Sequence, residues 1–286
     1  MLIDYHMHLE RDEVTGPCPY TVARIEEYVR AAERRGVAEI GISEHCHRFA
    51  EFRDLFRPIY EAPGADHPGV AWLRDNFYET LDRYVKAVEH AKQRGLPVKL
   101  GLEVDWLPGA EARLREILAP YPWDYLIGSV HFLDGWPIDV SPDYGWPERD
   151  VAEVYRVYFT TLGDAARSGL FDILAHPDLV KKFGHRMDDP ASLYRLYQLV
   201  VDAARQSGTA IEISTAGLRY PVKELYPARA FLELAAQAGL AVTFASDAHD
   251  PAIVGQNLQR AAGAARAAGC RHLARFTRRR RELIPI

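Results

Sequence analysis

The segment ARSGLFDILAHPD, residues 166–178, contains one complete structural unit. Its first residues complete a helical pattern that ends at Gly169, where glycine permits the left-handed C-terminal cap of a helix. A mostly apolar run follows, which is typical of a strand buried on both faces. The run ends in the ionisable residues His176 and Asp178. We therefore predict a helix, then a buried strand, then a cluster of ionisable side chains at the strand end.

The same unit recurs along the whole chain. Five further helical patterns end in glycine, at Gly36, Gly95, Gly208, Gly239 and Gly269. Six further strand-like runs are LIDYHMH (2–8), AEIGISEH (38–45), VKLGLEVD (98–105), YLIGSVH (125–131), AIEISTAG (210–217) and AVTFASDAH (241–249). Alternating helices and buried strands predict an α/β fold with a parallel sheet, and seven units in 286 residues fit a closed (β/α) barrel better than two open sheets. Because no linker interrupts the pattern, we expect residues 1–286 to form a single domain.

The composition narrows the class of protein. The chain has 35 basic and 40 acidic residues and a formal net charge of −5, which argues against nucleic acid as the main partner. Its three cysteines have no C-x-x-C spacing, which favours a reducing compartment over a disulfide framework. Neither a signal peptide nor a run of about 18 apolar residues is present. We expect a soluble cytoplasmic protein without a membrane partner.

Two connections are longer than the others. They span residues 46–76 and 133–149. Long ordered connections in a compact domain usually serve binding or as lids. We expect both to overhang the functional site.

The ends of the strand-like runs carry the chemistry. Six of the eleven histidines lie at the ends of five runs, accompanied by acidic residues. In His6-x-His8, in Glu103-x-Asp105 and in Asp247-x-His249, a spacing of two places both side chains on one face of a strand. The C-terminal ends of barrel strands meet at one mouth, where active sites of such folds lie. Burying so many ionisable groups without a metal would be too unfavourable, so we predict a metal site.

The mixture of imidazoles and carboxylates favours Zn, Mn or Fe over Ca or Mg. The number of candidate ligands exceeds what one ion requires, which indicates two or three ions. Clustered divalent ions are the usual catalysts of phosphate-ester hydrolysis in enzymes. Hydrolysis is therefore the predicted reaction class.

The chain lacks the signatures of competing chemistries. It contains no G-x-x-x-x-G-K-[ST] or G-x-G-x-x-G phosphate loop, no G-x-S-x-G elbow and no H-E-x-x-H helix. Cys46 follows His45, but adjacency in sequence does not make a catalytic pair, and we expect Cys46 to be buried. The arginine-rich segment 277–283 is interpreted as a solvated edge.

Taken in order, the motifs H-x-H, E-H, G-x-E-x-D, S-V-H, A-H-P-D and S-D-A-H resemble the PHP (polymerase and histidinol phosphatase) superfamily. Within it the chain is most similar to the monofunctional histidinol-phosphatases. That similarity rests on residues 121–139, 166–186 and 213–228, and it extends from residue 2 to the C-terminus. It implies a distorted seven-stranded (β/α) barrel with a trinuclear metal centre at the C-terminal mouth of the strands.

The resemblance also implies how the ligands are shared. The first ion would be held by His6, His8, Glu103 and Asp247, the second by Glu103, His131 and His176, and the third by His45 and His249. The family commonly has a further histidine shortly after H-x-H, where this chain has LERDEVTG. Glu10 is the expected substitute, with Asp12 and Glu13 behind it.

A phosphate ester also requires cationic partners. Arg219 is the first candidate, because a guanidinium matches phosphate geometry bidentately. Lys182, His185 and Arg186 follow another strand end and are further candidates for substrate binding. In the second long connection, aromatic and acidic residues are candidates for holding an imidazole and an ammonium group: Trp136, Asp139, Tyr144 and Trp146.

The predicted function is a metal-dependent phosphatase that hydrolyses L-histidinol phosphate to L-histidinol and phosphate in histidine biosynthesis. Glu103, His176, Asp247 and Arg219 are the predicted catalytic residues. Three alternatives remain open at this point. They are a PHP phosphoesterase for a nucleotide, a sugar phosphate or a nucleic-acid 3′ end, a metal-dependent amidohydrolase, and a metal-stabilised module without activity.

Overall fold

The parallel strands are arranged in two sheets. The computed structural model describes residues 1–10, 16–62 and 67–286. The first sheet has the order β1 (Leu2–Asp4), β2 (Val37–Ile42), β3 (Val98–Leu100). The parallel part of the second has the order β4 (Glu103–Asp105), β5 (Ile127–Ser129), β8 (Ile173–Leu174), β9 (Ala210–Ser214), β10 (Val242–Ala245).

Backbone hydrogen bonds join the two sheets at both edges. Tyr5 donates its backbone N–H to the carbonyl of Phe244 at 3.0 Å, next to β1 and β10. At the other edge, Gly101 donates to Ile42 at 2.8 Å between β3 and β4, which are separated by only two residues. The strands thus form a ring in which β3 and β4 together occupy one strand position. Each of the seven predicted runs contributes a strand to this ring. The prediction of a distorted seven-stranded barrel is confirmed.

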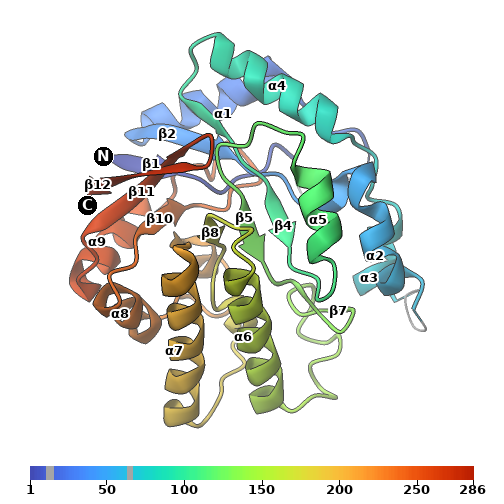
Figure 1. The fold of residues 1–286 in the computed structure, drawn as a ribbon, viewed down its shortest axis with the longest axis vertical. Coiled ribbons are helices and arrows are strands. Elements are labelled where there is room, and N and C mark those ends of the chain that lie inside the picture. Colours follow the sequence, from blue (N-terminus) through green and yellow to red (C-terminus); the bar gives the residue numbers. More distant parts are fainter. Residues whose placement is uncertain (11–15, 63–66) are drawn as a thin grey trace.

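Helices surround this ring (Figure 1). They are α1 (Val22–Arg34), α4 (Leu81–Gln93), α5 (Glu111–Leu118), α6 (Val151–Arg167), α7 (Pro190–Ser207), α8 (Arg229–Gln237) and α9 (Leu258–Ala268). The six glycines predicted to end helices all have positive φ, between 62° and 92°. Several helices also begin with a side-chain cap, as where Thr21 accepts the backbone N–H of Arg24. In the part of the chain that the structure describes, no helix is long and apolar enough to cross a membrane.

Aromatic side chains fill the interior of the ring. Tyr125 is fully buried, stacks on Tyr5 at 4.9 Å between ring centroids, and donates its hydroxyl to the Tyr5 carbonyl. Two glycines on neighbouring strands leave room for this ring: a Cβ at Gly41 would lie 1.9 Å from the Tyr125 hydroxyl, and one at Gly101 would lie 2.4 Å from the ring. A single buried cluster runs from Ile3 to Phe276, which supports the proposal of one domain.

The substitution Gly41→Ala should therefore destabilise the protein by about 1–3 kcal/mol, the usual penalty of overpacking a core. Gly263→Ala is the matched control, because Gly263 is exposed within α9 and a Cβ there meets nothing within 4 Å. The control should stabilise the helix by up to about 1 kcal/mol. Melting temperatures of the two variants measure both effects, and equal values would contradict this account of the barrel interior.

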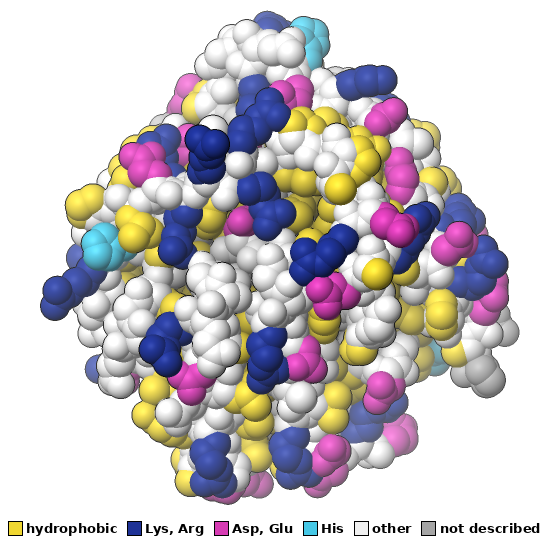
Figure 2. Space-filling model, in the orientation of Figure 1, with side chains coloured by type: hydrophobic (Ala, Val, Ile, Leu, Met, Phe, Trp, Pro, Cys, Tyr) yellow, Lys and Arg dark blue, Asp and Glu magenta, His cyan; other side chains and the backbone are white. Residues whose placement is uncertain are grey.

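The C-terminal hairpin was not predicted. Strand β11 (His272–Thr277) pairs parallel with β10, and β12 (Arg280–Pro285) returns antiparallel along its outer edge. Arg275 and Arg279 anchor the hairpin through ion pairs with Glu39 and Asp172. Residues 280–282 are exposed, as expected for a solvated edge. On the face seen in Figure 2, basic and acidic side chains are interspersed.

The two long connections contain regular structure. The first includes the 3₁₀ turns η1 (Cys46–Arg48) and η2 (Ala50–Phe52) and the helices α2 (Arg53–Tyr60) and α3 (Pro68–Arg74). The second includes the short hairpin of β6 (Phe132–Leu133) and β7 (Trp136–Pro137). Two further 3₁₀ turns, η3 (Leu179–Lys181) and η4 (Ala216–Leu218), follow β8 and β9.

Candidate metal centre

Glu103 is at the centre of a cluster of histidines at the C-terminal ends of the strands. Both of its carboxylate oxygens are surrounded by histidine nitrogens, which lie 2.6 to 3.7 Å away. Five histidines from the ends of four strands make these contacts: His6, His8, His45, His131 and His176. The convergence follows from the topology, because parallel strands of a ring all end at the same mouth.

The ligand-type atoms form three groups, in each of which the atoms lie within 4.8 Å of one another. They are His6 with His8 and Glu103, Glu103 with His131 and His176, and His8 with His45 and His249. The first two correspond to the expected first and second ion sites. Asp247 completes the first, since its Oδ1 lies 3.5 Å from His8 Nε2 and 3.8 Å from His6 Nε2.

The third group contains His8 in addition to the expected His45 and His249. Glu10 follows directly after Leu9, whose backbone N–H donates to Glu44 at 2.6 Å. That Glu10 completes the third group remains a prediction. Asp12 and Glu13, the acidic residues expected behind Glu10, lie outside the described residues.

The buried polar atoms of the cluster fit divalent ions. Several of them are fully buried and have no hydrogen-bond partner among the described residues: His6 Nε2, both ring nitrogens of His8 and Glu103 Oε2. Such groups are strongly unfavourable in a protein interior unless something coordinates them. All of these atoms border the three groups, and imidazole with carboxylate is a donor set that suits Zn, Mn or Fe. The residues present therefore fit metal ions.

Two carboxylates orient His6 and His131 by contacting the ring nitrogen that faces away from Glu103. His6 Nδ1 contacts Glu212 at 2.8 Å, and His131 Nδ1 contacts Asp105 at 2.7 Å. Each contact directs the Nε2 atom of the ring toward Glu103. This is the usual arrangement of a metal-binding histidine and its outer carboxylate.

The cluster is strongly coupled electrostatically. Burial opposes the charge of Glu103, but the imidazoles of His6, His45 and His131 lower its pKa well below the usual range. Burial also opposes the charge of His131, yet Asp105 and Glu103 raise its pKa to about 9. Glu103 therefore stays an anion at neutral pH, as a bridging ligand requires.

Arg219 lies behind Asp247. One guanidinium nitrogen, Nη2, donates to the backbone carbonyls of Ser246 and Asp247, both at 2.9 Å. Asp247 has a φ of 51°, a left-handed conformation that is unfavourable for a residue other than glycine. Arg219 thus supports a strained turn that carries a candidate ligand. Its second nitrogen, Nη1, is buried without a hydrogen-bond partner among the described residues.

A cavity of about 420 Å³ adjoins the histidines. Three histidines of the site region border it, His45, His47 and His131, and its other walls are Trp72, Phe132, Pro137, Asp139, Val140, Lys182 and Tyr220. Trp72 comes from the first long connection and Asp139 from the second, so both connections overhang the site as predicted. Lys182 Nζ donates to Asp139 Oδ2 at 3.0 Å and lies 4.3 Å from the Tyr220 ring centroid.

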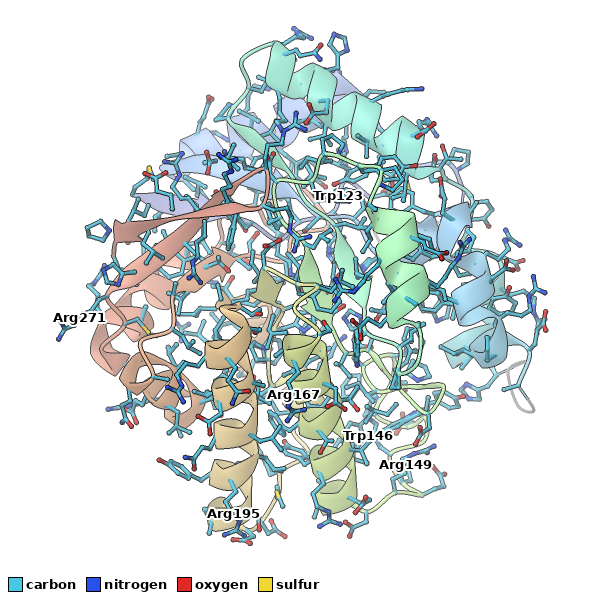
Figure 3. The ribbon with its side chains drawn as sticks, in the orientation of Figure 1. Trp123, Trp146, Arg149, Arg167, Arg195 and Arg271 are labelled. Carbon is cyan, nitrogen blue, oxygen red and sulfur yellow. The ribbon has the colours of Figure 1, made fainter. Side chains whose placement is uncertain are left out.

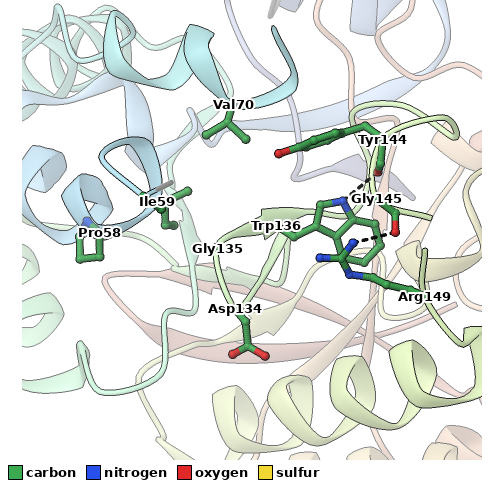
Figure 4. A pocket seen from close by; sticks show the side chains of 10 residues that line it. Pro58, Ile59, Val70, Asp134, Gly135, Trp136, Tyr144, Gly145 and Arg149 are labelled. Carbon is green, nitrogen blue, oxygen red and sulfur yellow. Dashed lines mark hydrogen bonds between the residues drawn. The ribbon is translucent and has the colours of Figure 1, made fainter. Parts of the chain in front are cut away.

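Three candidates for substrate binding lie elsewhere. Trp136 borders a separate pocket of about 380 Å³, where the Arg149 guanidinium lies 4.2 Å from its ring centroid (Figure 4). His185 stacks on Trp146 at 4.1 Å, and Arg186 is paired with Glu224 on the surface. Figure 3 places Trp146 with Arg149 in the connection before α6. Trp136, His185 and Arg186 therefore do not border the cavity that adjoins the histidines, in contrast to the expectation that they lie with the other substrate-binding candidates.

Sequence reasoning missed His47 as a site residue. His47 lies in η1, stacks on His45 at 4.7 Å between ring centroids, and contacts Asp105 at 3.5 Å. Burial lowers its pKa to about 4, so the ring is neutral at physiological pH. The motif H-C-H after the second strand was a signal for this residue. Cys46 is fully buried, as predicted.

A ring of histidines around a buried glutamate, at the mouth of a parallel barrel, defines a class of metal-dependent hydrolases. The chain belongs to the PHP domain family, whose model matches residues 4–216. A protein of Deinococcus radiodurans named "Probable histidinol-phosphatase" is 36% identical over 89% of this chain and 88% of its own length. A protein of the same name from Schizosaccharomyces pombe is 25% identical over 84% of this chain and 79% of its own length.

A solved structure has the same fold. It is a histidinol phosphate phosphatase from Lactococcus lactis, complexed with zinc, L-histidinol and phosphate. The TM-score is 0.73 at 20% sequence identity, and the match covers 98% of each chain. At this identity the likeness describes the fold alone.

Proposed function

We propose that the protein is a metal-dependent phosphomonoesterase that hydrolyses L-histidinol phosphate to L-histidinol and phosphate. The observation that carries the proposal is the convergence of five buried histidines on Glu103 beside an open cavity. The names of the Deinococcus and Schizosaccharomyces relatives support the substrate. The ligands of the lactococcal structure support both the substrate and the use of zinc.

The centre is proposed to hold two or three divalent ions, with Zn, Mn or Fe as candidates. His6, His8, Glu103 and Asp247 would hold one, and Glu103, His131 and His176 a second. His45 and His249 would hold a third, with His8 nearest to them and Glu10 as the candidate that the sequence suggests. When bound, such ions supply Lewis-acid polarisation of the phosphoryl group and activation of water as a nucleophile.

The protein side chains position the phosphoryl group. Arg219 is held by its two backbone contacts, which leaves the buried Nη1 to donate to a phosphoryl oxygen. A fixed guanidinium stabilises charge that develops on the phosphoryl oxygens. Glu103 belongs to two candidate ion groups and stays anionic, so its carboxylate would hold an ion of the first site and an ion of the second.

The cavity is proposed to hold the leaving group of the substrate. Its walls are mainly aromatic and apolar, with Trp72, Phe132 and Tyr220, and suit a flat imidazole ring. Asp139 places a carboxylate among these walls, and the Lys182 ammonium helps to keep its pKa low despite burial. We propose that Asp139 binds the ammonium group of the substrate and that Lys182 lies near its phosphate group.

Asp139→Asn should then raise KM for L-histidinol phosphate by about 10- to 100-fold, because a hydrogen bond between charged groups contributes about 1.5–3 kcal/mol. The KM for a phosphate ester that lacks an amine should change little. Asp143→Asn is the control, since Asp143 is exposed in the same connection. Steady-state phosphate release measures both constants, and an equal loss for the two esters would contradict the assignment.

A phosphate-release panel tests the function itself. Metal-loaded protein would be assayed with L-histidinol phosphate, a nucleoside monophosphate, a sugar phosphate and a 3′-phosphorylated oligonucleotide. We expect the highest kcat/KM for L-histidinol phosphate. A higher kcat/KM for another ester would show that this ester, and not L-histidinol phosphate, is the preferred substrate. Absence of phosphate release from all of them would favour an amidohydrolase or a module without activity.

A further inference from the structure

Glu212 contacts residues of two different candidate ion sites. It lies on β9, and only 1% of its surface is exposed. Its Oε2 is 2.8 Å from His6 Nδ1, and its Oε1 accepts the backbone N–H of His176 at 3.0 Å. One buried carboxylate therefore uses one oxygen for a ligand of the first site and the other oxygen for a ligand of the second.

The contact with His176 supports a strained backbone. His176 has a φ of 22°, outside the regions that side-chain-bearing residues prefer. Its carbonyl accepts the backbone N–H of Leu179 at 2.9 Å and, at 3.4 Å, the Tyr158 hydroxyl. The ring atom His176 Nδ1 is buried without a hydrogen-bond partner among the described residues, so no outer carboxylate holds this nitrogen as Glu212 holds Nδ1 of His6. The direction of the His176 ring therefore depends on its backbone, whose N–H is held by Glu212.

The neighbouring carboxylate Asp105 differs in this respect. It contacts His131 at 2.7 Å and His47 at 3.5 Å, and of these two only His131 belongs to a candidate ion group. Asp105 therefore acts on one site, whereas Glu212 acts on two.

We propose that Glu212 is a positioning residue that couples the first and second ion sites, an inference that rests on the proposed metal centre. It keeps the proton of His6 on Nδ1, so that Nε2 faces Glu103 and Asp247 as a ligand atom. It also holds the His176 backbone in the conformation that aims the ring at Glu103.

The geometry makes glutamine an informative replacement. A carboxylate can accept from His6 and from the His176 backbone at the same time, but an amide has one acceptor and one donor end. If the amide oxygen accepts from His176, the NH₂ group faces His6 Nδ1. The His6 proton then moves to Nε2 and blocks the ligand atom. If the amide is flipped, its NH₂ group opposes the His176 N–H, and the strained backbone is released. Either orientation disturbs a candidate ligand.

The test is a zinc titration of metal-free protein against a competing chelator, with elemental analysis of the loaded protein. The variants are Glu212→Gln, Asp105→Asn and, as control, Glu282→Gln on the exposed edge strand. Loss of an outer carboxylate typically lowers metal affinity 10- to 100-fold. We expect Glu212→Gln to weaken two zinc sites by about this factor, Asp105→Asn to weaken one, and the control to match the wild type.

Melting temperatures of the metal-free proteins separate positioning from folding. A merely structural role would lower the melting temperature of Glu212→Gln while leaving the zinc affinities of the folded protein unchanged, and this would overturn the proposal. An effect on a single zinc site would overturn it as well. Should the glutamine variant fail to fold, Glu212→Asp keeps the charge but is one methylene too short for both contacts. Glu212→Asp should show the same loss of zinc affinity at two sites, and wild-type zinc affinity in this variant would contradict the proposal.

The zinc titration also distinguishes this proposal from the proposed function. Wild-type protein that binds zinc but does not hydrolyse L-histidinol phosphate would overturn the substrate assignment, while the affinities would still decide the role of Glu212. Wild-type protein that binds no zinc would overturn the metal centre and this proposal together.

Discussion

Replacement of Glu103 by alanine is expected to lower kcat/KM for L-histidinol phosphate by at least about 1,000-fold. This exceeds the 10- to 100-fold loss typical of an outer-shell residue, because Glu103 itself contacts histidines from four strand ends. Its carboxylate is also the shared member of two candidate ion groups. Without it, the histidines around it lose the anion that they share.

Elemental analysis should show that Glu103→Ala retains fewer ions per chain than the wild type. Glu282→Ala, on the exposed edge strand, is the matched control and should keep full activity. The melting temperature of each metal-free variant shows whether the fold is kept. Turnover by Glu103→Ala at the wild-type rate would refute the catalytic interpretation and favour a binding module.

Removal of the metal ions should abolish phosphate release and lower stability together. Ions that bind only the folded chain stabilise it by about 2.7 kcal/mol per site when present at 100 times their Kd. Each occupied site therefore adds to the melting temperature, and a chelator should remove that increment. Activity and melting temperature should return together when Zn, Mn or Fe(II) is restored, at two or three ions per chain.

The effect of chelation should depend on pH. Ligands must be deprotonated to bind metal, and the carboxylates raise the pKa of His131 to about 9 in the metal-free state. Protons therefore compete with the ions increasingly as the pH falls from 9, and the apparent Kd for zinc, corrected for protonation of the chelator, should rise. Full activity in a rigorously metal-free preparation would contradict the account.

Much of the centre could be predicted because its residues come at or shortly after the ends of parallel strands, which all meet at one mouth of the barrel. His6 and His8 follow β1, and Asp247 and His249 follow β10. The expected ligands of the first two ion sites lie in the cluster. His45 and His249 form the third group together with His8, and that Glu10 completes this group remains a prediction.

The substrate side was harder to predict. Asp139 and Lys182 border the cavity, whereas Trp136, His185 and Arg186, which are close to them in sequence, do not. Turns and hairpins reverse the side-chain direction within a few residues, and composition does not reveal the reversal. Glu212 lies within the run AIEISTAG, but its contacts with His6 and His176 depend on distances between strands far apart in the chain.

The β11–β12 hairpin escaped prediction for a different reason. Its six-residue strands carry arginines that suit a charged surface as well as a strand. Their pairing depends on acids from distant elements, Glu39 and Asp172. The long connection at 46–76 resembles a loop in the sequence because its two helices are short, and Pro58 within α2 obscures the helical pattern.

Anomalous diffraction from crystals of the zinc-loaded protein, grown with L-histidinol and phosphate, tests the central claim most directly. We predict zinc peaks beside Glu103, within coordination distance of His6 and His8 on one side and of His131 and His176 on the other. Phosphate should lie against them within reach of Arg219 Nη1, and the imidazole ring should lie in the cavity near Tyr220. Zinc bound elsewhere, or phosphate outside the mouth of the barrel, would contradict the account.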